Sequence, residues 1–205
     1  MKARAPVFTA LFLTITISSC MAQSNKYKTV TEAKGLQAGD VVPGFTAMDQ
    51  HDVEYELNKL LKKSPVVLIF IRGQWCPVCT KHITRIQDSL PFIYQKGASV
   101  AVVSPEKPEF LKKTIEKTGA EFTLLYDEGY KISDAFNVTF LPDSATRAIY
   151  NSKLSAKLKE SHSDDSERLP IPATFIIGQN SKIKWRHFDP DYKKRASVKD
   201  ILNNL

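Results

Sequence analysis

Cysteine is scarce in this chain of 205 residues, which contains only Cys20, Cys76 and Cys79. Three cysteines cannot form the network of disulfide bonds that stabilises a small secreted scaffold with little core. Glycine is also sparse, and none of the eight glycines belongs to a G-x-x-x-x-G-K loop for phosphate or to a serine nucleophile elbow. The sequence therefore gives no support for an NTPase or a serine hydrolase.

Beyond the N-terminus, no apolar run is long enough to span a bilayer. Residues 1–22 combine a basic start, an apolar run from Val7 to Ile17 and small residues, which is typical of a secretory signal. Ile17-Ser18-Ser19-Cys20 resembles a bacterial lipobox, which would lipidate Cys20; ordinary cleavage after Ala22 is the alternative. We expect an exported protein, either periplasmic or held by lipid on the outer face of a bacterial membrane.

The rest of the chain divides into a polar tether over residues 23–37 and one folded domain over residues 38–205. The net charge is +7, with basic residues gathered between Lys182 and Arg195. No nucleic-acid motif accompanies them, so we interpret this cluster as a solvated face. Attraction to an anionic membrane surface or to an acidic protein is the alternative.

Continuous apolar segments separated by helical patterns predict an α/β fold with a central mixed sheet flanked by helices. Residues 45–57 alternate around a polar turn and predict an N-terminal β-hairpin. The expected central strands are residues 66–71, 99–103, 122–126, 173–177 and 182–186. The expected helices are residues 77–93 with a break at Pro91, then 108–118, 130–136, 144–159 and 197–205, with a loop over 160–167.

The most informative motif is Trp75-Cys76-Pro77-Val78-Cys79, which follows the first buried strand and begins a helix. Whether Cys20 is lipidated or removed by cleavage, Cys76 and Cys79 remain as one C-x-x-C pair. A disulfide between them would close only a short loop and so would stabilise the fold little. The helix N-terminus favours a thiolate. We therefore expect Cys76, at an exposed helix start, to be the nucleophile and Cys79 to be the resolving thiol.

Two neighbours of the pair are predicted to support it. Arg72 is close enough in sequence to lower a thiol pKa. Trp75 is interpreted either as a lid over the sulfur or as a packing residue.

The pair and its surroundings resemble known redox proteins. Trp75-Cys76-Pro77-Val78-Cys79 is similar to the W-C-x-x-C of thioredoxins, and Ile171-Pro172-Ala173-Thr174-Phe175 is similar to the segment that carries their cis-proline. The stretch from Gly39 to Leu205 resembles AhpC/TSA peroxiredoxin-like proteins with an R-G-x-W-C-P-x-C motif. The resemblance implies a thioredoxin-like fold and functional roles for Pro172 and Thr174.

The chain also departs from peroxiredoxins, which carry P-x-x-x-T-x-x-C. Arg72 stands at the proline, Cys76 at the threonine and Cys79 at the peroxidatic cysteine. Those enzymes bring an arginine to the sulfur from just before a late strand, where this chain has Pro172. Arg72 or Arg168 is the expected substitute for that cation.

The resemblance implies a thiol-dependent peroxidase that reduces hydrogen peroxide and organic hydroperoxides without a bound cofactor or metal, and is recycled by a thioredoxin-like dithiol. Thiol–disulfide exchange with protein substrates is the alternative enzyme function. A third hypothesis is Cu(I) binding by Cys76, Cys79 and a histidine. His82 is expected on the helix surface, and nucleic acid is not an expected partner.

Overall fold

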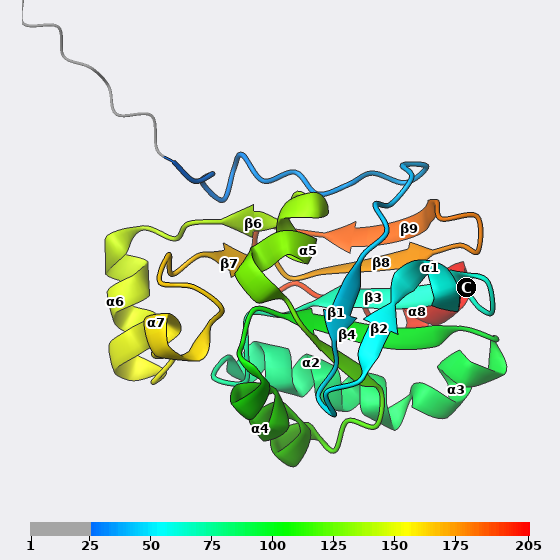
Figure 1. Ribbon diagram of the computed structural model, residues 1–205, viewed down its shortest axis with the longest axis horizontal. Helices are drawn as coiled ribbons and strands as arrows, with labels where there is room; N and C mark the ends of the chain where they lie inside the picture. The colour runs from blue at the N-terminus through cyan, green and yellow to red at the C-terminus, as the bar shows by residue number, and fades with distance from the viewer. Residues whose placement is uncertain (1–25) are drawn as a thin grey trace, which may run out of the picture.

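A five-stranded mixed sheet forms the centre of residues 26–205, the part of the chain that the computed structural model describes (Figure 1). Its strands, in spatial order, are β5 (Thr123–Tyr126), β4 (Ser99–Ser104), β3 (Val66–Phe70), β8 (Ala173–Ile177) and β9 (Ile183–Phe188). β3, β4 and β5 are parallel, whereas β8 runs antiparallel to both β3 and β9. The predicted α/β architecture with a mixed sheet is confirmed.

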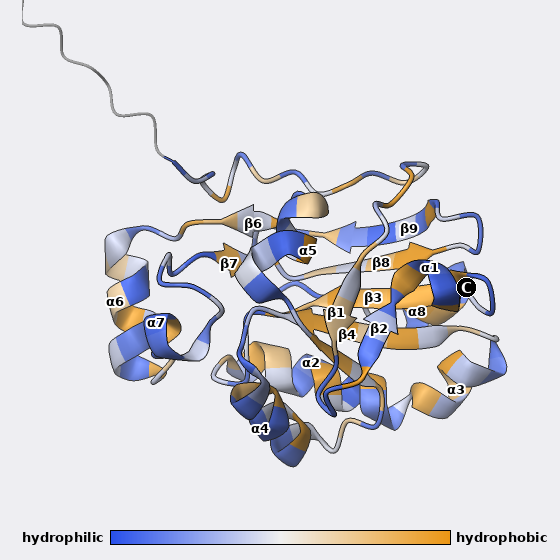
Figure 2. Ribbon diagram, viewed as in Figure 1, coloured by the Kyte–Doolittle hydropathy of each residue, from blue (hydrophilic) through white to orange (hydrophobic). Residues whose placement is uncertain are grey.

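Both faces of this sheet are covered, as the continuous apolar runs predicted. The helices are α1 (Leu57–Leu61), α2 (Pro77–Asp88), α3 (Leu90–Gln95), α4 (Pro108–Thr118), α5 (Lys131–Ala135), α6 (Ser144–Lys153), α7 (Leu158–Ser161) and α8 (Val198–Asn204), with a 3-10 turn at Glu128–Tyr130. Val67 and Ile69 of β3 pack with α2, α3 and α8, and their neighbours Leu68 and Phe70 pack with α1 and α5. Figure 2 shows the sheet as a mostly hydrophobic layer between amphipathic helices.

Three helices begin and end where local chemistry predicted. α4 runs from Pro108 to Thr118, and its C-cap, Gly119, adopts the left-handed conformation with φ of 65° that glycine tolerates. Pro91 stands in the first turn of α3, so the long helix predicted over residues 77–93 is two helices. Ser197 caps α8 by accepting the backbone N–H of Asp200.

The predicted hairpin is present as β1 (Thr46–Met48) and β2 (Glu54–Glu56). It lies across the end of β5, where the Gln50 side chain bonds the backbone of Phe122 and Leu124. The short helix α1, which follows β2 directly, was not predicted, because Leu57 reads equally well as the last residue of a strand.

Residues 137–168 form an excursion at one end of the sheet. β6 (Thr139–Phe140) and β7 (Leu169–Pro170) pair at its base, and α6 and α7 extend beyond them. The prediction of one helix over residues 144–159 is wrong, because the backbone takes positive φ at Ser155 and Lys157. This turn buries Leu158, whose N–H donates to the Asn151 side chain.

Residues 26–37 lie along the domain surface. Gly35 and Leu36 donate backbone hydrogen bonds to Asn137 and Phe136, and Arg186 donates to the carbonyl of Leu36. The described part of the segment predicted as a tether is therefore docked on the domain. The predicted signal and Cys20 lie outside the described residues. No helix in residues 26–205 is long and apolar enough to cross a membrane.

Candidate redox site

The site forms where β3 ends and α2 begins. Cys76 is the N-cap of α2, and its sulfur accepts the backbone N–H of Cys79 at 3.3 Å. Pro77 takes the first helical position, where its missing N–H costs no helical hydrogen bond. The predicted placement of the pair at a helix N-terminus is confirmed.

Both cysteines are fully buried, and their sulfur atoms lie 2.7 Å apart. A disulfide bond is about 2.05 Å long, so a small movement of either side chain would allow the bond to form. The expectation that Cys76 is exposed is wrong. The Arg72 and Trp75 side chains, both at most 5% exposed, pack around the start of α2 and help to shield the two sulfurs from solvent.

Arg72 approaches the pair from the loop after β3. Its Nη2 donates to the Cys76 sulfur at 3.0 Å and its Nη1 donates to the Tyr150 hydroxyl at 2.9 Å. The guanidinium also lies 3.9 Å from the ring centroid of Tyr192, in the range of a cation–π contact. Within residues 26–205 no carboxylate forms an ion pair with Arg72, so the sulfurs provide its negative charge.

A second arginine reaches the other sulfur. Arg195, from the segment before α8, places Nη2 at 3.4 Å from the Cys79 sulfur. Arg168, the other cation expected near the pair, is bound instead to Asp134 and Asp164 at 3.0 Å each. Of the two cations expected at the pair, Arg72 therefore lies beside it, whereas Arg168 forms its ion pairs with carboxylates instead.

The two thiols share one negative charge. The hydrogen bond with Cys79, burial and the charge of Cys79 raise the pKa of Cys76. Burial opposes ionisation of Cys79 as well, but its hydrogen bond with Cys76 and the cations Arg195 and Arg72 hold its pKa well below the ordinary value. Burial also opposes the charge on Arg72, but the adjacent sulfurs outweigh it and raise the pKa of the guanidinium. The arrangement thus stabilises one thiolate next to one thiol.

Trp75 is a buried packing residue that helps to shield the sulfur pair, and it presents little surface to a partner. Its ring lies 5.1 Å from the Tyr150 ring and the same distance from the Arg72 guanidinium, and its Nε1 donates to His162 at 3.4 Å. His162 is buried, which lowers its pKa to about 4, and its other ring nitrogen lies 2.9 Å from the Tyr130 hydroxyl. This buried chain fixes the indole behind Arg72.

Glu106 holds the loop that carries Arg72 and Trp75. Its Oε2 accepts the Gln74 backbone N–H at 2.7 Å, while its buried Oε1 has no hydrogen-bond partner in the described part of the chain. Burial raises the pKa of Glu106 to about 8. Gly73 must pass this carboxyl closely, because a Cβ at position 73 would lie 2.6 Å from the Glu106 Cδ.

The late motif contributes less directly to the site. Pro172 and Thr174 are buried at the start of β8, where Thr174 is paired with Ile69 and His187, but no hydrogen bond joins either residue to a sulfur within the described chain. No peptide bond in residues 26–205 is cis, so the expected cis-proline at Pro172 is wrong. Residues 171–172 link β7 to β8, and the trans isomer is the preferred form of an X–Pro bond.

Two further expectations concern histidine. His82 is buried on α2 and not on the helix surface, since it shares a helix face with Cys79 and Ile86. Within residues 26–205 no three His, Cys, Asp or Glu side chains are grouped to hold a metal ion, so the copper hypothesis lacks its ligand set.

Sequence reasoning missed Arg195, Tyr150 and Tyr192 as site residues. Tyr192 and Arg195 lie in the segment Phe188-Asp189-Pro190-Asp191-Tyr192 with Arg195-Ala196 behind it, which also resembles the AhpC/TSA peroxiredoxin-like proteins, and this resemblance was the available signal for them. No sequence signal was available for Tyr150, because it lies 78 positions after Arg72 and reaches the site from the excursion of residues 137–168.

A central mixed sheet with a cysteine pair at the start of its first long helix defines a thioredoxin-fold thiol protein. The model of the AhpC/TSA family matches residues 38–186, and the chain belongs to that family. Solved structures agree on the fold. BcpB from Mycobacterium tuberculosis matches with a TM-score of 0.63 at 21% identity, covering 82% of this chain and 96% of that one. A cysteine-to-serine mutant of PrxQ from Xylella fastidiosa matches with a TM-score of 0.65 at 17% identity, covering 83% and 95%.

Curated relatives are peroxiredoxins. Peroxiredoxin Bcp of Escherichia coli K12 is 31% identical over 103 residues, which are 50% of this chain and 65% of that protein. Chloroplastic peroxiredoxin Q of Sedum lineare is 31% identical over 145 residues, which are 64% of this chain and 76% of that protein. The chain thus spans just under two thirds of the length of the Escherichia coli relative.

Proposed function

We propose that the protein is a thiol-dependent peroxidase that reduces hydrogen peroxide and organic hydroperoxides through Cys76 and Cys79. The observation that carries this function is the sulfur pair, 2.7 Å apart and contacted by Arg72 and Arg195. Fixed cations stabilise the thiolate that attacks, and they stabilise the oxygen that leaves with negative charge. The names of its relatives, peroxiredoxin Bcp and peroxiredoxin Q, support the same reaction.

Cys79 is the attacking sulfur in this proposal. Its pKa is the one held below the ordinary value, and it occupies the position of the peroxidatic cysteine in the family motif. The exposure that favoured Cys76 is absent, since both sulfurs are buried. Cys76 lies at the threonine position of that motif and becomes the resolving thiol.

The reaction balances without a bound cofactor. The Cys79 thiolate attacks one peroxide oxygen, the O–O bond breaks, and a proton from solvent converts the leaving oxygen to water or an alcohol. The Cys76 thiol then displaces hydroxide from the sulfenic acid; water and a Cys76–Cys79 disulfide result. A thioredoxin-like protein dithiol reduces this disulfide and is itself oxidised.

Stopped-flow tryptophan fluorescence of the reduced protein with hydrogen peroxide tests the proposal, because Trp75 lies beside the pair. Cys79→Ala should abolish rapid oxidation. Cys76→Ala should keep the first step and stop at a sulfenic acid that dimedone traps. The opposite pattern would reverse the two roles, and oxidation no faster than that of free cysteine would refute a peroxidase.

Thiol–disulfide exchange with proteins is less well supported. The relatives reported above are named peroxiredoxins, whereas burial of the sulfurs does not separate the two functions, because a protein dithiol must also reach them for recycling. Wild-type protein that ignores peroxide but reduces a protein disulfide would establish this alternative.

We also propose that the protein is exported and anchored through lipid on Cys20. The basic and apolar N-terminal sequence supports export, and the lipobox resemblance of residues 17–20 supports the anchor. Labelled palmitate should be incorporated into the wild-type protein and not into Cys20→Ala. Equal labelling of the two would contradict lipidation at this residue.

A further inference from the structure

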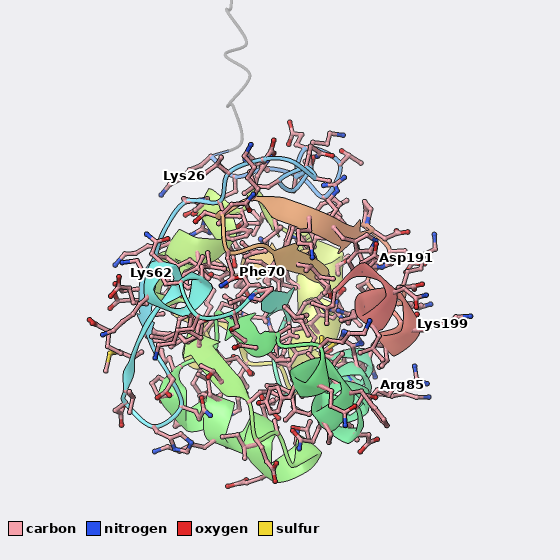
Figure 3. All side chains as sticks on the ribbon, turned by 90° about the vertical axis from the view of Figure 1, so that its right-hand side faces the viewer. Lys26, Lys62, Phe70, Arg85, Asp191 and Lys199 are labelled. Atoms are coloured by element: carbon pink, nitrogen blue, oxygen red, sulfur yellow. The ribbon has the colours of Figure 1, made fainter. Side chains whose placement is uncertain are left out.

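Glu106 is a buried carboxyl group that lacks the partners a buried charge needs. Figure 3 shows charged side chains such as Arg85 and Lys199 extending outward from the molecule, whereas Phe70, the last residue of β3, lies near its centre. Glu106 follows β4, the neighbour of β3 in the sheet, and has no exposed surface. Its Oε2 accepts one N–H, its Oε1 accepts none, and no cation in the described part of the chain forms an ion pair with it. So little compensation for lost water favours the protonated acid.

The other carboxyl with no exposed surface in residues 26–205 shows the difference. Asp127 accepts the backbone N–H of Ile132 at one oxygen, at 2.7 Å, and that of Ser133 at the other, at 2.9 Å. The fold itself therefore satisfies both oxygens of Asp127 in the first turn of α5. Glu106 caps no helix in this way, so its free oxygen is not explained by local structure.

The Glu106 carboxyl lies against the loop that carries the redox site. Its Oε1 and the Nε1 of Trp75 are both 2.7 Å from the position that a Cβ of residue 73 would occupy. Trp75 packs on Arg72, and the charge of Cys79 adds to the effect of burial in raising the pKa of Glu106. A change of charge at the sulfur pair therefore acts on this carboxyl through protein, where charges interact more strongly than in water.

Three titratable groups face Glu106 besides the cysteine pair. α4 contributes Lys117 and Lys113, whose charges lower the pKa of Glu106, and the Lys117 ammonium is bonded to Gln74. The excursion contributes His162, which forms a β-bridge with Glu106 and is neutral near pH 7, because burial lowers its pKa to about 4. All three carry the same charge in both redox states. The sulfur pair is thus the part of the surroundings whose charge changes.

We propose that Glu106 is a proton-binding site linked to the redox state of the cysteine pair. In the reduced protein the pair carries one negative charge and Glu106 holds a proton. When the sulfurs form a disulfide, that charge disappears while the cations Arg72 and Arg195 remain, so Glu106 releases its proton more readily. Oxidation therefore releases two electrons and two protons, one from the Cys76 thiol and one from Glu106. Reduction of a hydroperoxide to an alcohol and water consumes the same number of each.

This inference requires a redox-active pair and does not depend on which oxidant the pair meets. Equilibration of the reduced and oxidised protein with dithiothreitol, at about pH 6.5 and about pH 7.5, tests it. Dithiothreitol keeps both thiol protons in this range, so a protein that takes up two protons exchanges with it without a net proton. Alkylation of the remaining thiols measures the ratio of dithiol to disulfide in the protein.

The variant Glu106→Gln takes up only the thiol proton of Cys76 on reduction. Its equilibrium constant for reduction should rise about tenfold per pH unit, which corresponds to about 30 mV. The wild-type constant should rise at least about threefold less over the same unit. The matched control, Glu109→Gln at an exposed position of α4, should follow wild type. An equal rise in wild type and Glu106→Gln would overturn the proposal.

A second measurement examines the wild-type carboxyl directly. In the infrared difference spectrum near pH 7, oxidation should remove the C=O band of a protonated carboxyl and add the bands of a carboxylate. Glu106→Gln should lack this change and Glu109→Gln should keep it. A wild-type spectrum without any carboxyl change would refute the inference even if Glu106→Gln does not fold. A protein that shows the change with a disulfide oxidant but ignores peroxide would retain the proton site and lose only the peroxidase.

Discussion

Replacing Glu106 with glutamine should change how the stability of the protein depends on pH. The buried carboxyl keeps its proton up to about pH 8 in the folded protein, whereas its ordinary pKa is 4.5. A pKa raised by folding contributes stability that is fully present below the unfolded value and is lost as pH rises through the folded value. Between these two values the native state holds one more proton than the unfolded chain. Wild type should therefore lose about 1.4 kcal/mol per pH unit from this group.

Glu106→Gln keeps an oxygen that accepts the Gln74 N–H but cannot ionise. Its free energy of unfolding therefore does not fall with pH through this group. From about pH 5.5 to about pH 7.5, the free energy of unfolding of wild type should fall relative to the variant by up to roughly 3 kcal/mol. Urea unfolding of the reduced proteins measures the difference at each pH, and groups common to both proteins cancel. Exposed Glu109, on α4, supplies the control Glu109→Gln, which should run parallel to wild type. Parallel curves for wild type and Glu106→Gln would refute the reasoning, because Glu106 would then be ionised in the folded protein.

Three further changes probe the site. Arg72→Gln removes a cation 3.0 Å from the Cys76 sulfur, so the thiolate should form at a pH at least about one unit higher than in wild type. Thiolate absorbance at 240 nm measures this titration. An unchanged titration would show that Arg72 does not stabilise the thiolate. Tyr192→Ala removes the aromatic ring over Arg72, a cation–π contact worth about 0.5–2 kcal/mol. Oxidation by peroxide should become several-fold slower in this variant, whereas Tyr192→Phe, which keeps the ring, should react at the wild-type rate. Equal rates for the two variants would show that the ring is dispensable. Gly73 has φ of 143°, and a Cβ added there would lie 2.6 Å from Glu106, so Gly73→Ala should lower the free energy of unfolding by more than about 2 kcal/mol. Thermal unfolding measures this loss against Gly97→Ala, whose added Cβ meets nothing within 4 Å and which should lose much less. Similar losses in the two variants would mean that the loop of Gly73 can shift.

Where local chemistry decides the structure, the sequence was sufficient. The run of residues 66–71 became a buried strand, Pro108 and Gly119 marked the ends of α4, and the cysteine pair began a helix. Even the buried position of His82 was available in principle, because it stands three residues after Cys79 and four before Ile86. A polar side chain favours the helix surface, but at position 82 the helical spacing decides and the imidazole is buried.

Contacts between distant segments account for the errors. Arg195 is 116 positions from Cys79 and reaches it only because β9 and the segment after it return to the start of α2. The helix predicted over residues 144–159 ends early, since burying Leu158 stabilises a turn that local propensity does not predict. The burial of both sulfurs likewise depends on Trp75 packing with Tyr150, which arrives from the excursion.

The absence of a carboxylate beside Arg72, within the described residues, also bears on the reduction potential of the protein. In the reduced state the shared sulfur charge balances this buried guanidinium, and it balances Arg195 in part. A disulfide carries no charge, so oxidation leaves Arg72 buried with only the Tyr150 hydroxyl and aromatic faces around it. We therefore expect the folded protein to favour its dithiol form, which would make its disulfide a stronger oxidant than one without buried cations. The cations that stabilise the attacking thiolate, Arg72 and Arg195, are thus also expected to favour reduction of the disulfide by a partner dithiol.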